Sequence, residues 1–302
     1  MSPRSVALIG ARGYVGQEMV RLLGEDSNFK IAFATSREAT GTQTISGHEV
    51  TFEVLEPVAI AKRCCDAYVL GLPNGLSAPY VEAIGAHAPE SVIVDLSTDH
   101  RHKEGWFYGL PEIQGQAGRK ATRIANPGCY ATAAILALWP LRELITNTPT
   151  VVGLSGYSGA GTTPSDKNNQ DRLRENVLPY AFAGHAHQGE ISTAIGHQVT
   201  FAPHVMPFFR GLMVTVTAQL SQDASAEALQ QRFEAAYAAS PVVRVQTEPP
   251  EPQAVADTSN AVVGGFAFNA ETKVMTAACA LDNLLKGAAS QAHDNLKQSF
   301  GI

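Results

Sequence analysis

The chain has 302 residues, of which 45% are hydrophobic and 17% charged, and its formal net charge is −6 at pH 7. This composition is typical of a soluble globular protein with one large or two ordinary domains, and the acidic balance argues against a nucleic-acid-binding protein. No apolar run reaches the roughly 18 residues of a membrane-spanning helix, and the amino-terminal stretch lacks the apolar core of a signal peptide. We therefore expect a cytoplasmic protein without a nucleic-acid or membrane partner.

Short apolar runs alternate with helical periodicity in the first third of the chain. The predicted strands are residues 5–10, 30–36, 66–73 and 91–97, and the predicted helices are residues 13–25 and 77–88. Alternation of this kind is typical of βαβ units. It predicts an α/β fold that begins with a Rossmann-type, doubly wound parallel sheet.

The pattern changes after Cys129. The predicted strands are residues 150–161, 211–220, 241–247, 262–271 and 273–281, with one amphipathic helix at residues 224–239. A long polar stretch without a predicted element runs from Thr162 to about His187, and residues 282–301 are predicted to be helical. Strands with few helices between them predict a second domain of α+β type with a mixed or antiparallel sheet.

Three glycines mark the turn between the first predicted strand and helix. Gly10, Gly13 and Gly16 have GxxGxxG spacing in "IGARGYVGQEMV". Glycine lets the backbone approach a pyrophosphate closely, and the helix N-terminus offers N–H donors and positive potential. This strand–turn–helix context predicts a dinucleotide site, whereas the alternative is a tight turn without a ligand. The predicted contacts in the turn are Gly10, Arg12, Gly13, Tyr14, Val15 and Gly16.

The end of the second predicted strand bears on the choice of cofactor. NAD sites usually place an acidic residue there to hold the ribose hydroxyls. This chain has Ser36 and Arg37 instead, in "FATSREATG". Arginine pairs well with a 2′-phosphate, so we favour NADP(H) over NAD. The alternative is a solvated surface arginine.

The stretch "ANPGCYATAAI" places Cys129 directly after Asn-Pro-Gly and at the start of a helix-forming run. The positive end of a helix favours an anion, and a cysteine there tends to have a lowered pKa. The alternative is a small buried residue that packs the helix start. The chain has four cysteines and no Cys-x-x-Cys pair, which predicts neither a zinc site nor a disulfide framework.

A thiolate beside a nicotinamide cofactor suits reduction of an acyl group that is first attached to sulfur. Such chemistry needs a general acid or base, most often histidine. Three stretches offer one: "AGHAHQGEIS", "FAPHVMPFFRG" and "STDHRHKEGW". Spacing alone does not choose among them.

Taken together, these stretches make the chain similar to a known family. Along essentially its whole length it resembles the N-acetyl-γ-glutamyl-phosphate reductases of arginine biosynthesis, which are similar to the aspartate-semialdehyde dehydrogenases. The matching segments include "GARGYVGQEMVRLL", "LGLPNGLSAPYV", "VDLSTDHR", "NPGCYATA", "SGYSGAGTTPSDKNN", "GHAHQGEIS" and "PHVMPFFRGLMVTV". The resemblance implies NADPH-dependent reductive dephosphorylation of N-acetyl-γ-glutamyl phosphate through a thioester on Cys129.

The resemblance also implies catalytic roles for a histidine pair. His187, the second histidine of the family's His-x-His pattern, is our first choice for the acid/base, and His185 is the reserve. The family commonly has arginine between the two histidines, where this chain has alanine. Glu190 keeps the family's acidic position and is expected to orient a histidine or bind the acetamido group.

Three basic residues are the remaining candidates for substrate binding. Arg210 is expected to hold the α-carboxylate, because guanidinium binds carboxylates bidentately. Arg101 is a weaker candidate for the phosphate or the carboxylate. Lys167 either neutralises the phosphate or is a solvated loop lysine.

Further cofactor contacts are implied outside the glycine turn. Pro73 and Asn74 belong to "LGLPNGLSAPYV", and Ser158 and Gly159 belong to the Gly/Ser-rich "SGYSGAG" turn. Asn283 is expected at the nicotinamide carboxamide, with a helix N-cap as the alternative. No metal ligand is expected.

The resemblance implies two domains and a homodimer or homotetramer. We expect a nucleotide-binding domain of residues 1–128 plus 284–302, and a catalytic and oligomerisation domain of residues 129–283. Two alternatives stay open. One is a sister reductase that acts on aspartyl phosphate or N-acetyl-α-aminoadipyl phosphate, and the other is a cofactor-sensing protein that has lost catalysis.

Overall fold

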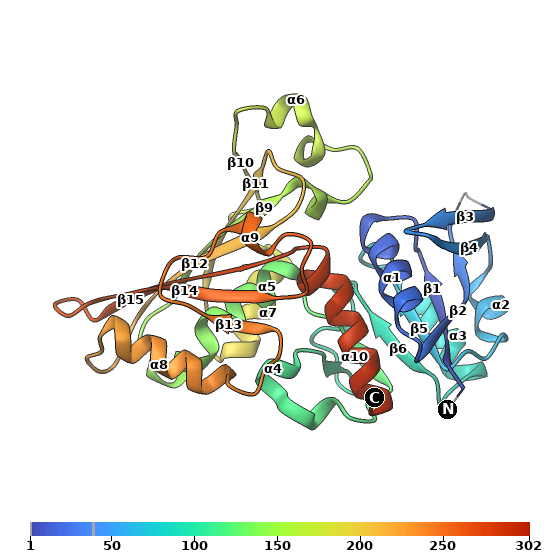
Figure 1. The fold of residues 1–302 in the computed structure, drawn as a ribbon, viewed down its shortest axis with the longest axis horizontal. Helices are drawn as coiled ribbons and strands as arrows, with labels where there is room; N and C mark the ends of the chain where they lie inside the picture. The colour runs from blue at the N-terminus through green and yellow to red at the C-terminus, as the bar shows by residue number, and fades with distance from the viewer. Residues whose placement is uncertain (1, 38–39) are drawn as a thin grey trace. The chain divides into compact units, whose positions relative to one another are not determined.

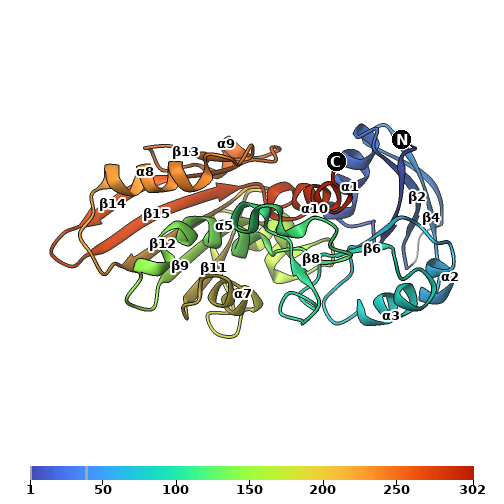
Figure 2. The same cartoon turned by 90° about the horizontal axis from the view of Figure 1, so that it is seen from below.

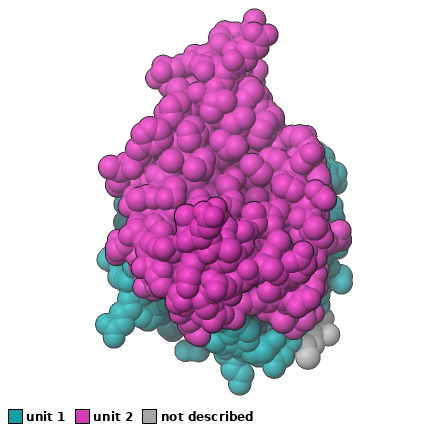
Figure 3. Space-filling view, turned by 90° about the vertical axis from the view of Figure 1, so that its left-hand side faces the viewer, with its two compact units in different colours: residues 1–127, 288–302 teal, residues 128–287 magenta. Residues whose placement is uncertain are grey.

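The computed structural model describes residues 2–37 and 40–302. The chain forms two compact units, which Figure 3 colours separately. Unit 1 consists of Met1–Pro127 and Ala288–Ile302, and unit 2 of Gly128–Gly287. Each unit has its own sheet (Figure 1).

Among its described residues, the sheet of unit 1 has eight strands in the order β3-β4-β2-β1-β5-β6-β8-β7. Their bounds are β1 (Arg4–Ile9), β2 (Phe29–Thr35), β3 (Gly41–Ile45), β4 (His48–Glu53), β5 (Ala67–Leu70), β6 (Val92–Asp95), β7 (Phe107–Tyr108) and β8 (Arg123–Ala125). All neighbouring strands are parallel except β3 and β4. The predicted Rossmann-type sheet is therefore confirmed.

Helices cover both faces of this sheet, so its central strands are buried on both sides. The helices of unit 1 are α1 (Tyr14–Glu25), α2 (Pro57–Ala61), α3 (Ala78–His87), α4 (Pro111–Gln114) and α10 (Ser290–Phe300). In β1, Val6 and Leu8 join a core cluster with residues of α1 and α10. Ala7 and Ile9 join a second cluster with residues of α2 and α3. Alternate strand residues thus enter opposite cores, as period-2 geometry requires.

The β3–β4 hairpin was not predicted. Its first strand, "GTQTI", is polar and almost wholly exposed, so it carries no apolar alternation that indicates a strand. The hairpin forms because β4 pairs with β2 at the edge of the sheet. Pairing with β2 and burial of Val50 and Phe52 of β4 hold this element, while β3 contributes no core residue.

A half-buried pair ties α10 to the turn before β2, and it makes unit 1 sensitive to acid. His293 Nε2 lies 3.0 Å from Asp26 Oδ2. Burial lowers the pKa of His293 although Asp26 favours its charged form. Burial alone would raise the pKa of Asp26, but hydrogen bonds from Asn28 outweigh it and hold that pKa below its ordinary value.

Both shifts predict stability that falls with acid. The unfolded chain binds a proton at His293 below pH 6.5, the ordinary histidine pKa, while the folded chain resists it. The Asp26 contribution is present above its ordinary pKa of 3.8 and is lost as the pH falls through the lower folded value. We expect His293→Asn to flatten the fall in urea midpoint between about pH 7 and 5. The exposed His102→Asn is the control, and an unchanged pH slope in His293→Asn would contradict the assignment.

The sheet of unit 2 has seven strands in the order β10-β11-β9-β12-β15-β14-β13. Their bounds are β9 (Thr150–Gly156), β10 (Leu178–Pro179), β11 (Thr200–Met206), β12 (Leu212–Gln219), β13 (Val243–Val245), β14 (Ala261–Asn269) and β15 (Val274–Leu281). The β9–β11 and β13–β14 pairs are parallel and the other pairs antiparallel. The prediction of a mixed sheet is confirmed.

The helices of unit 2 are α5 (Cys129–Leu138), α6 (Gln170–Leu173), α7 (Ala186–Ile195), α8 (Ala226–Tyr237) and α9 (Pro252–Val255). Helix α5 packs on β12, β15 and α7 (Figure 2). Every residue of α5 after Cys129 is buried. Helix α8 packs on β13 and β14, and Tyr237 at its end donates a 2.7 Å hydrogen bond to the carbonyl of Leu136 in α5.

One face of the unit 2 sheet is partly exposed. Every second residue of the central strands β9 and β12 carries its side chain on that face. The cross-strand rows Met213–Leu154 and Thr215–Val152 lie on that face, and Val152 is 36% exposed. Beside the sheet, the polar stretch that was predicted to lack elements contains α6 and β10. Polar side chains cap the helical turns of this stretch. Ser165 and Asn168 form a capping box at the turn Asp166–Asn168, and Asn169 caps α6.

No helix among residues 2–37 and 40–302 is long and apolar enough to cross a membrane. In the same residues, no group of three or more His, Cys, Asp or Glu side chains could hold a metal ion.

Candidate active site

The glycine turn of unit 1 connects β1 to α1, at the carboxyl end of the parallel strands. Gly10 has φ +78°, and an added Cβ would lie 2.5 Å from the carbonyl oxygen of Gly71. A Cβ on Gly16 would lie 2.2 Å from the carbonyl oxygen of Ala11. The fold itself therefore requires both glycines.

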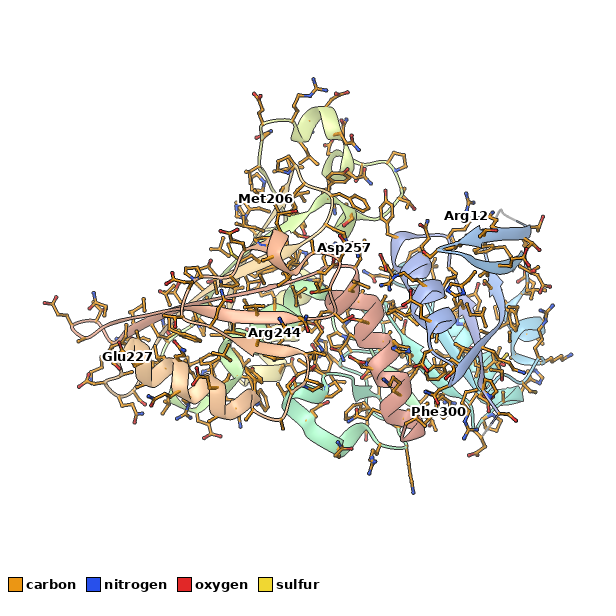
Figure 4. All side chains as sticks on the ribbon, in the orientation of Figure 1. Arg12, Met206, Glu227, Arg244, Asp257 and Phe300 are labelled. Carbon is orange, nitrogen blue, oxygen red and sulfur yellow. The ribbon has the colours of Figure 1, made fainter. Side chains whose placement is uncertain are left out.

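Gly13 differs from the other two glycines of the turn. It is the N-cap residue of α1, and an added Cβ would meet no atom of the chain within 4 Å. The open space lies at the N-terminus of a long helix that has no acidic residue in its first turn. This is the arrangement that admits a pyrophosphate to the helix N–H groups. Arg12, beside it, is labelled in Figure 4.

Three predicted cofactor segments meet at this edge. The N–H groups of Gly10 and Ala11 both donate to the carbonyl of Thr35, the last residue of β2, which brings the turn to Ser36 and Arg37. Ser36 is buried and Arg37 is exposed. Pro73 and Asn74 lie in the 72–76 loop after β5, and Leu72 lies within 3.3 Å of the Cβ position built on Gly10.

In unit 2, Cys129 is the first residue of α5 and is half-buried. Gly128 is the N-cap in extended conformation, and its carbonyl accepts the N–H of Thr132 at 2.8 Å and the Thr132 hydroxyl at 3.0 Å. These two hydrogen bonds fix the first turn of the helix. Cys129 stands where the peptide N–H groups of a helix end converge, as the sequence predicted.

Glu190 supports the residue that precedes the thiol. It lies on α7 and is 1% exposed, and its Oε1 accepts the N–H of Gly128 at 2.8 Å. The sequence assigned it to a histidine or to the acetamido group. The structure adds a contact with the main chain that positions Cys129, and its expected contact with substrate stays a prediction.

The histidine pair begins α7, and its members have different surroundings. His185 is the N-cap, and its Nδ1 accepts the N–H of His187 at 3.2 Å. An accepting ring nitrogen carries no proton. Burial lowers the pKa of His185, and the charge of Lys167 lowers it further. His185 is therefore held neutral with its proton on Nε2.

Aromatic rings surround the pair. Tyr130, the residue after the thiol, contacts both histidines, with centroid distances of 6.4 Å to His185 and 6.0 Å to His187. Tyr180 packs against His185 at 5.6 Å, and Lys167 Nζ lies 4.9 Å from the centroid of the Tyr180 ring. Burial raises the pKa of Tyr180, and the charge of Cys129 adds to this shift. Lys167, the histidines and the thiol thus belong to one neighbourhood in unit 2.

Gly287 packs directly against the thiol-bearing residue. A Cβ added there would lie 2.6 Å from Cys129 Cβ and 3.2 Å from the carbonyl oxygen of Asp282. We expect Gly287→Ala to displace Cys129 and to lower kcat by about 100-fold, the usual effect of a 1 Å misplacement. Stopped-flow turnover measures it, with Gly85→Ala in α3 as the control because that site is open. Equal kcat in the two variants would refute this packing argument.

Arg210 has carboxylate partners within unit 2. Its Nε lies 2.7 Å from Oδ2 of Asp282, which is fully buried. Its Nη1 donates to the exposed Asp257, and Figure 4 labels Asp257. A substrate carboxylate would displace Asp257 more readily than Asp282, because the exposed partner is screened by water. Binding of the α-carboxylate by Arg210 stays a prediction.

Three residues predicted at the nicotinamide end form a cluster in unit 2. Asn283 Nδ2 donates to Ser158 Oγ at 2.9 Å, and its Oδ1 accepts the N–H of Gly211 at 2.9 Å. Gly159 lies beside them, with its Cβ position 3.2 Å from Ser155 Oγ. Asn283 is 3% exposed, and these contacts place its amide within unit 2. Its predicted contact with the cofactor is untested.

Sequence models of a known family cover most of the chain. The semialdehyde dehydrogenase NAD binding domain matches residues 5–121, and the semialdehyde dehydrogenase dimerisation domain matches residues 129–283. An N-acetyl-γ-glutamyl-phosphate reductase of Stenotrophomonas maltophilia is 44% identical over 99% of this chain and 96% of its own length. The chain belongs to the N-acetyl-γ-glutamyl-phosphate reductase family. Reductases of the same name from Xanthomonas campestris and Xylella fastidiosa are 41% and 42% identical, over 100% and 99% of this chain and 97% and 93% of their own lengths.

The fold of this chain is similar to that of solved aspartate semialdehyde dehydrogenases. Aspartate semialdehyde dehydrogenase II of Vibrio cholerae superposes with a TM-score of 0.80 at 17% identity, over 99% of this chain and 98% of the other. The enzyme of Francisella tularensis gives 0.78 at 16% identity, over 97% and 99%. A nicotinamide nucleotide is the cofactor class of the N-acetyl-γ-glutamyl-phosphate reductase family, because its amino-terminal model is an NAD binding domain.

Several contacts of the reductase site were not predicted. Tyr130 follows the thiol directly, so the "NPGCYATA" segment pointed to its place but not to its contacts with the histidines. Tyr180 lies in the polar stretch, where no pattern distinguishes it. Gly287 and Asp282 belong to the same stretch as the predicted Asn283, but only the tertiary fold shows their contacts with Cys129 and Arg210.

Proposed function

We propose that this protein is an N-acetyl-γ-glutamyl-phosphate reductase. It reduces N-acetyl-L-glutamyl 5-phosphate to N-acetyl-L-glutamate 5-semialdehyde and releases phosphate, in arginine biosynthesis. Full-length relatives of that name at 41–44% identity support the substrate. The observation that carries the chemistry is Cys129 at the first position of α5, directly before Tyr130, whose ring packs against both histidines.

In the first half-reaction, His187 takes the proton of the Cys129 thiol. The thiolate sulfur bonds to the acyl carbon, the bond from that carbon to the phosphate oxygen breaks, and phosphate leaves. The product is a thioester on Cys129. N–H groups of the first turn of α5 are the donors available to the developing negative oxygen. Lys167 supplies positive charge for the departing phosphate.

In the second half-reaction the thioester becomes the aldehyde. When bound, NADPH supplies a hydride to the thioester carbon. Cys129 holds the resulting tetrahedral carbon, the carbon–sulfur bond breaks as the carbonyl reforms, and His187 returns its proton to the sulfur. The chain thus ends the cycle with a thiol and a neutral histidine, ready for the next acyl phosphate.

We assign the acid/base role to His187 and a structural role to His185. His185 Nδ1 caps α7 through the N–H of His187, so protonation of that nitrogen would break the cap. Burial, which lowers the pKa of His185, opposes the same protonation. His187 is therefore the member of the pair that cycles between neutral and charged forms.

We propose NADP(H) as the cofactor because Ser36 and Arg37 follow β2, where a ribose-binding acid is expected for NAD. Arg37 is exposed and follows the strand whose end bonds to the glycine turn. We expect Arg37→Ala to raise the KM for NADPH by about tenfold and to leave the KM for NADH unchanged, because one arginine–phosphate pair is lost. Steady-state kinetics with both nucleotides measures this. An unchanged ratio of the two KM values would overturn the NADP assignment.

We also propose that a second copy of the chain covers the partly exposed face of the unit 2 sheet. The rows that contain Leu154, Val152 and Met213 present apolar side chains there, and the matching family model is described as a dimerisation domain. Light scattering would then give a mass of two chains, or of four if such dimers pair. We propose the cytoplasm as the location of the reaction.

The reverse reaction tests the proposed function. N-acetylglutamate semialdehyde, phosphate and NADP are supplied, and formation of NADPH is followed by absorbance. Aspartate semialdehyde and NAD are run in parallel. Phosphate-dependent reduction of NADP with the acetylated substrate alone supports the proposal. Turnover only with aspartate semialdehyde moves the enzyme to another pathway, and no turnover in a protein that binds NADPH indicates a sensor.

A further inference from the structure

The residues after β6 form a rigid polar segment in unit 1, which we call the 95–101 segment. Asp95 ends β6 and is fully buried. Its carboxylate accepts the N–H of Ser97 at 3.0 Å and the Ser97 hydroxyl at 2.9 Å, and it lies 2.6 Å from His100 Nδ1. Ser97 and His100 are each 2% exposed. One buried carboxylate therefore fixes the segment at two points.

The histidine of this segment is structural. Its ring stacks on Trp106 with a centroid distance of 3.9 Å. Ser77 Oγ and Asp95 Oδ2 both lie on the Nδ1 side, at 3.3 Å and 2.6 Å. A Ser-His-Asp triad uses the two opposite ring nitrogens to pass a proton. Here both partners meet one nitrogen, so the three side chains lack the arrangement of a triad, and their contacts hold the segment in place.

Asp99 holds the 72–76 loop and the start of α3. Its carboxylate accepts the N–H of Gly75 at 2.7 Å, and the N–H and hydroxyl of Ser77 at 3.2 Å and 2.8 Å. The N–H of Thr98 donates in return to Asn74 Oδ1 at 3.1 Å. Burial alone would raise the pKa of Asp99, but the donors at Gly75 and Ser77 outweigh it and hold that pKa below its ordinary value. Asp99 therefore acts as a charged clamp on the loop that carries Pro73 and Asn74.

At the other end of the segment, Arg101 holds the main chain that leads to the thiol. Its Nε donates to the carbonyl of Asn126 at 3.0 Å, and its Nη2 donates to the carbonyl of Leu96 at 3.0 Å. The N–H of Asn126 donates to the carbonyl of Asp95 at 2.8 Å. Asn126 is the first residue of the Asn-Pro-Gly-Cys sequence. The segment thus hydrogen-bonds to both the N–H and the carbonyl of that residue.

We propose that the 95–101 segment is a two-ended positioning element for the reductase. Asp99 sets the loop that binds the nicotinamide nucleotide, and Arg101 sets the backbone that presents Cys129. The inference rests on the proposed function, and it gives Arg101 a positioning role beside the substrate contact expected from the sequence.

Asp99→Asn and Arg101→Gln should affect different quantities: the first the affinity for NADPH, the second the reactivity of Cys129. Asp99→Asn puts an amide NH2 against backbone donors, so we expect the Kd for NADPH to rise about tenfold. The rate of Cys129 alkylation by iodoacetamide should stay within about twofold. NADPH fluorescence and peptide mass spectrometry measure the two quantities. Glu104→Gln, an exposed neighbour, is the matched control.

Arg101→Gln removes both carbonyl contacts. We expect kcat and the rate of Cys129 alkylation to fall about tenfold, with the Kd for NADPH within about twofold of the parent. Arg101→Lys should recover part of the loss because one ammonium still reaches one carbonyl. Lys103→Gln removes a charge from an exposed neighbour and is the control.

Specific outcomes would overturn the inference. One is a rise in the KM for acyl phosphate at unchanged kcat in Arg101→Gln, which makes Arg101 a substrate ligand. Another is an unchanged Kd for NADPH in Asp99→Asn. If Asp99→Asn does not fold, Ser77→Ala removes one donor only, and it must raise the Kd about threefold or the clamp is wrong. Nucleotide binding and alkylation need no turnover, so a parent protein that lacks reductase activity refutes the proposed function and leaves this test intact.

Discussion

Cys129→Ser should lower kcat by about 10⁴-fold or more, because a serine hydroxyl at neutral pH is a far weaker nucleophile than a thiolate. No acyl-enzyme should form, so the burst of phosphate from the first turnover should disappear. The Kd for NADPH should remain that of the parent protein, because the nucleotide is proposed to bind unit 1. Rapid-quench phosphate release and intact-protein mass spectrometry provide the measurements.

The control is Cys64→Ser. Cys64 is an exposed cysteine whose Sγ bonds only to main-chain carbonyls in the contacts that the structure describes, and serine can make the same bonds. Its turnover should match the parent. A Cys129→Ser enzyme within about tenfold of the parent would exclude a thioester route.

His187→Asn should lower kcat by about 10²–10⁴-fold, the range expected for loss of a general acid/base. The pH dependence that a titrating histidine gives to kcat should vanish with it. His185→Asn should cost less than about tenfold, because asparagine is a good N-cap and replaces the Nδ1 acceptor with its own oxygen. pH–rate profiles of the two variants, measured side by side, test the assignment.

The pair of variants is informative because the two histidines lie only 4.8 Å apart, centroid to centroid. General damage to the pocket would affect both variants alike. If His185→Asn abolished activity and His187→Asn did not, the roles would have to be exchanged. His185→Ala, which lacks an acceptor, should be less stable to heat than His185→Asn.

Much of this picture was predictable from local sequence, for identifiable physical reasons. The strand–Gly10–helix order and the position of Cys129 at a helix start depend on backbone rules that act over a few residues. The β3–β4 hairpin was missed because β3 is polar and exposed and β4 contributes only Val50 and Phe52 to the core, a pattern too short to stand out before β4 pairs with β2.

Long-range partners were the unpredictable part of the site. Nothing local in "STDHR" reveals that Arg101 holds the carbonyl of Asn126, 25 residues away. The bond of Glu190 to Gly128 spans 62 residues, and an acidic residue near histidines suggests a side-chain partner, not a main-chain one. A residue's type could be assigned to a site, but its role depended on contacts that only the fold creates.

The burial of α5 has a consequence for how the enzyme moves and fails. A helix that is buried from its second residue onward opens only when its surroundings open, so the amides beyond its first turn should exchange with solvent water among the slowest in unit 2. The polar stretch around α6 has many exposed residues, so its amides should exchange faster than those of α5. On heating, activity should decline together with global melting of unit 2 and not before it. Cys129 should therefore stay in position until the core of unit 2 unfolds.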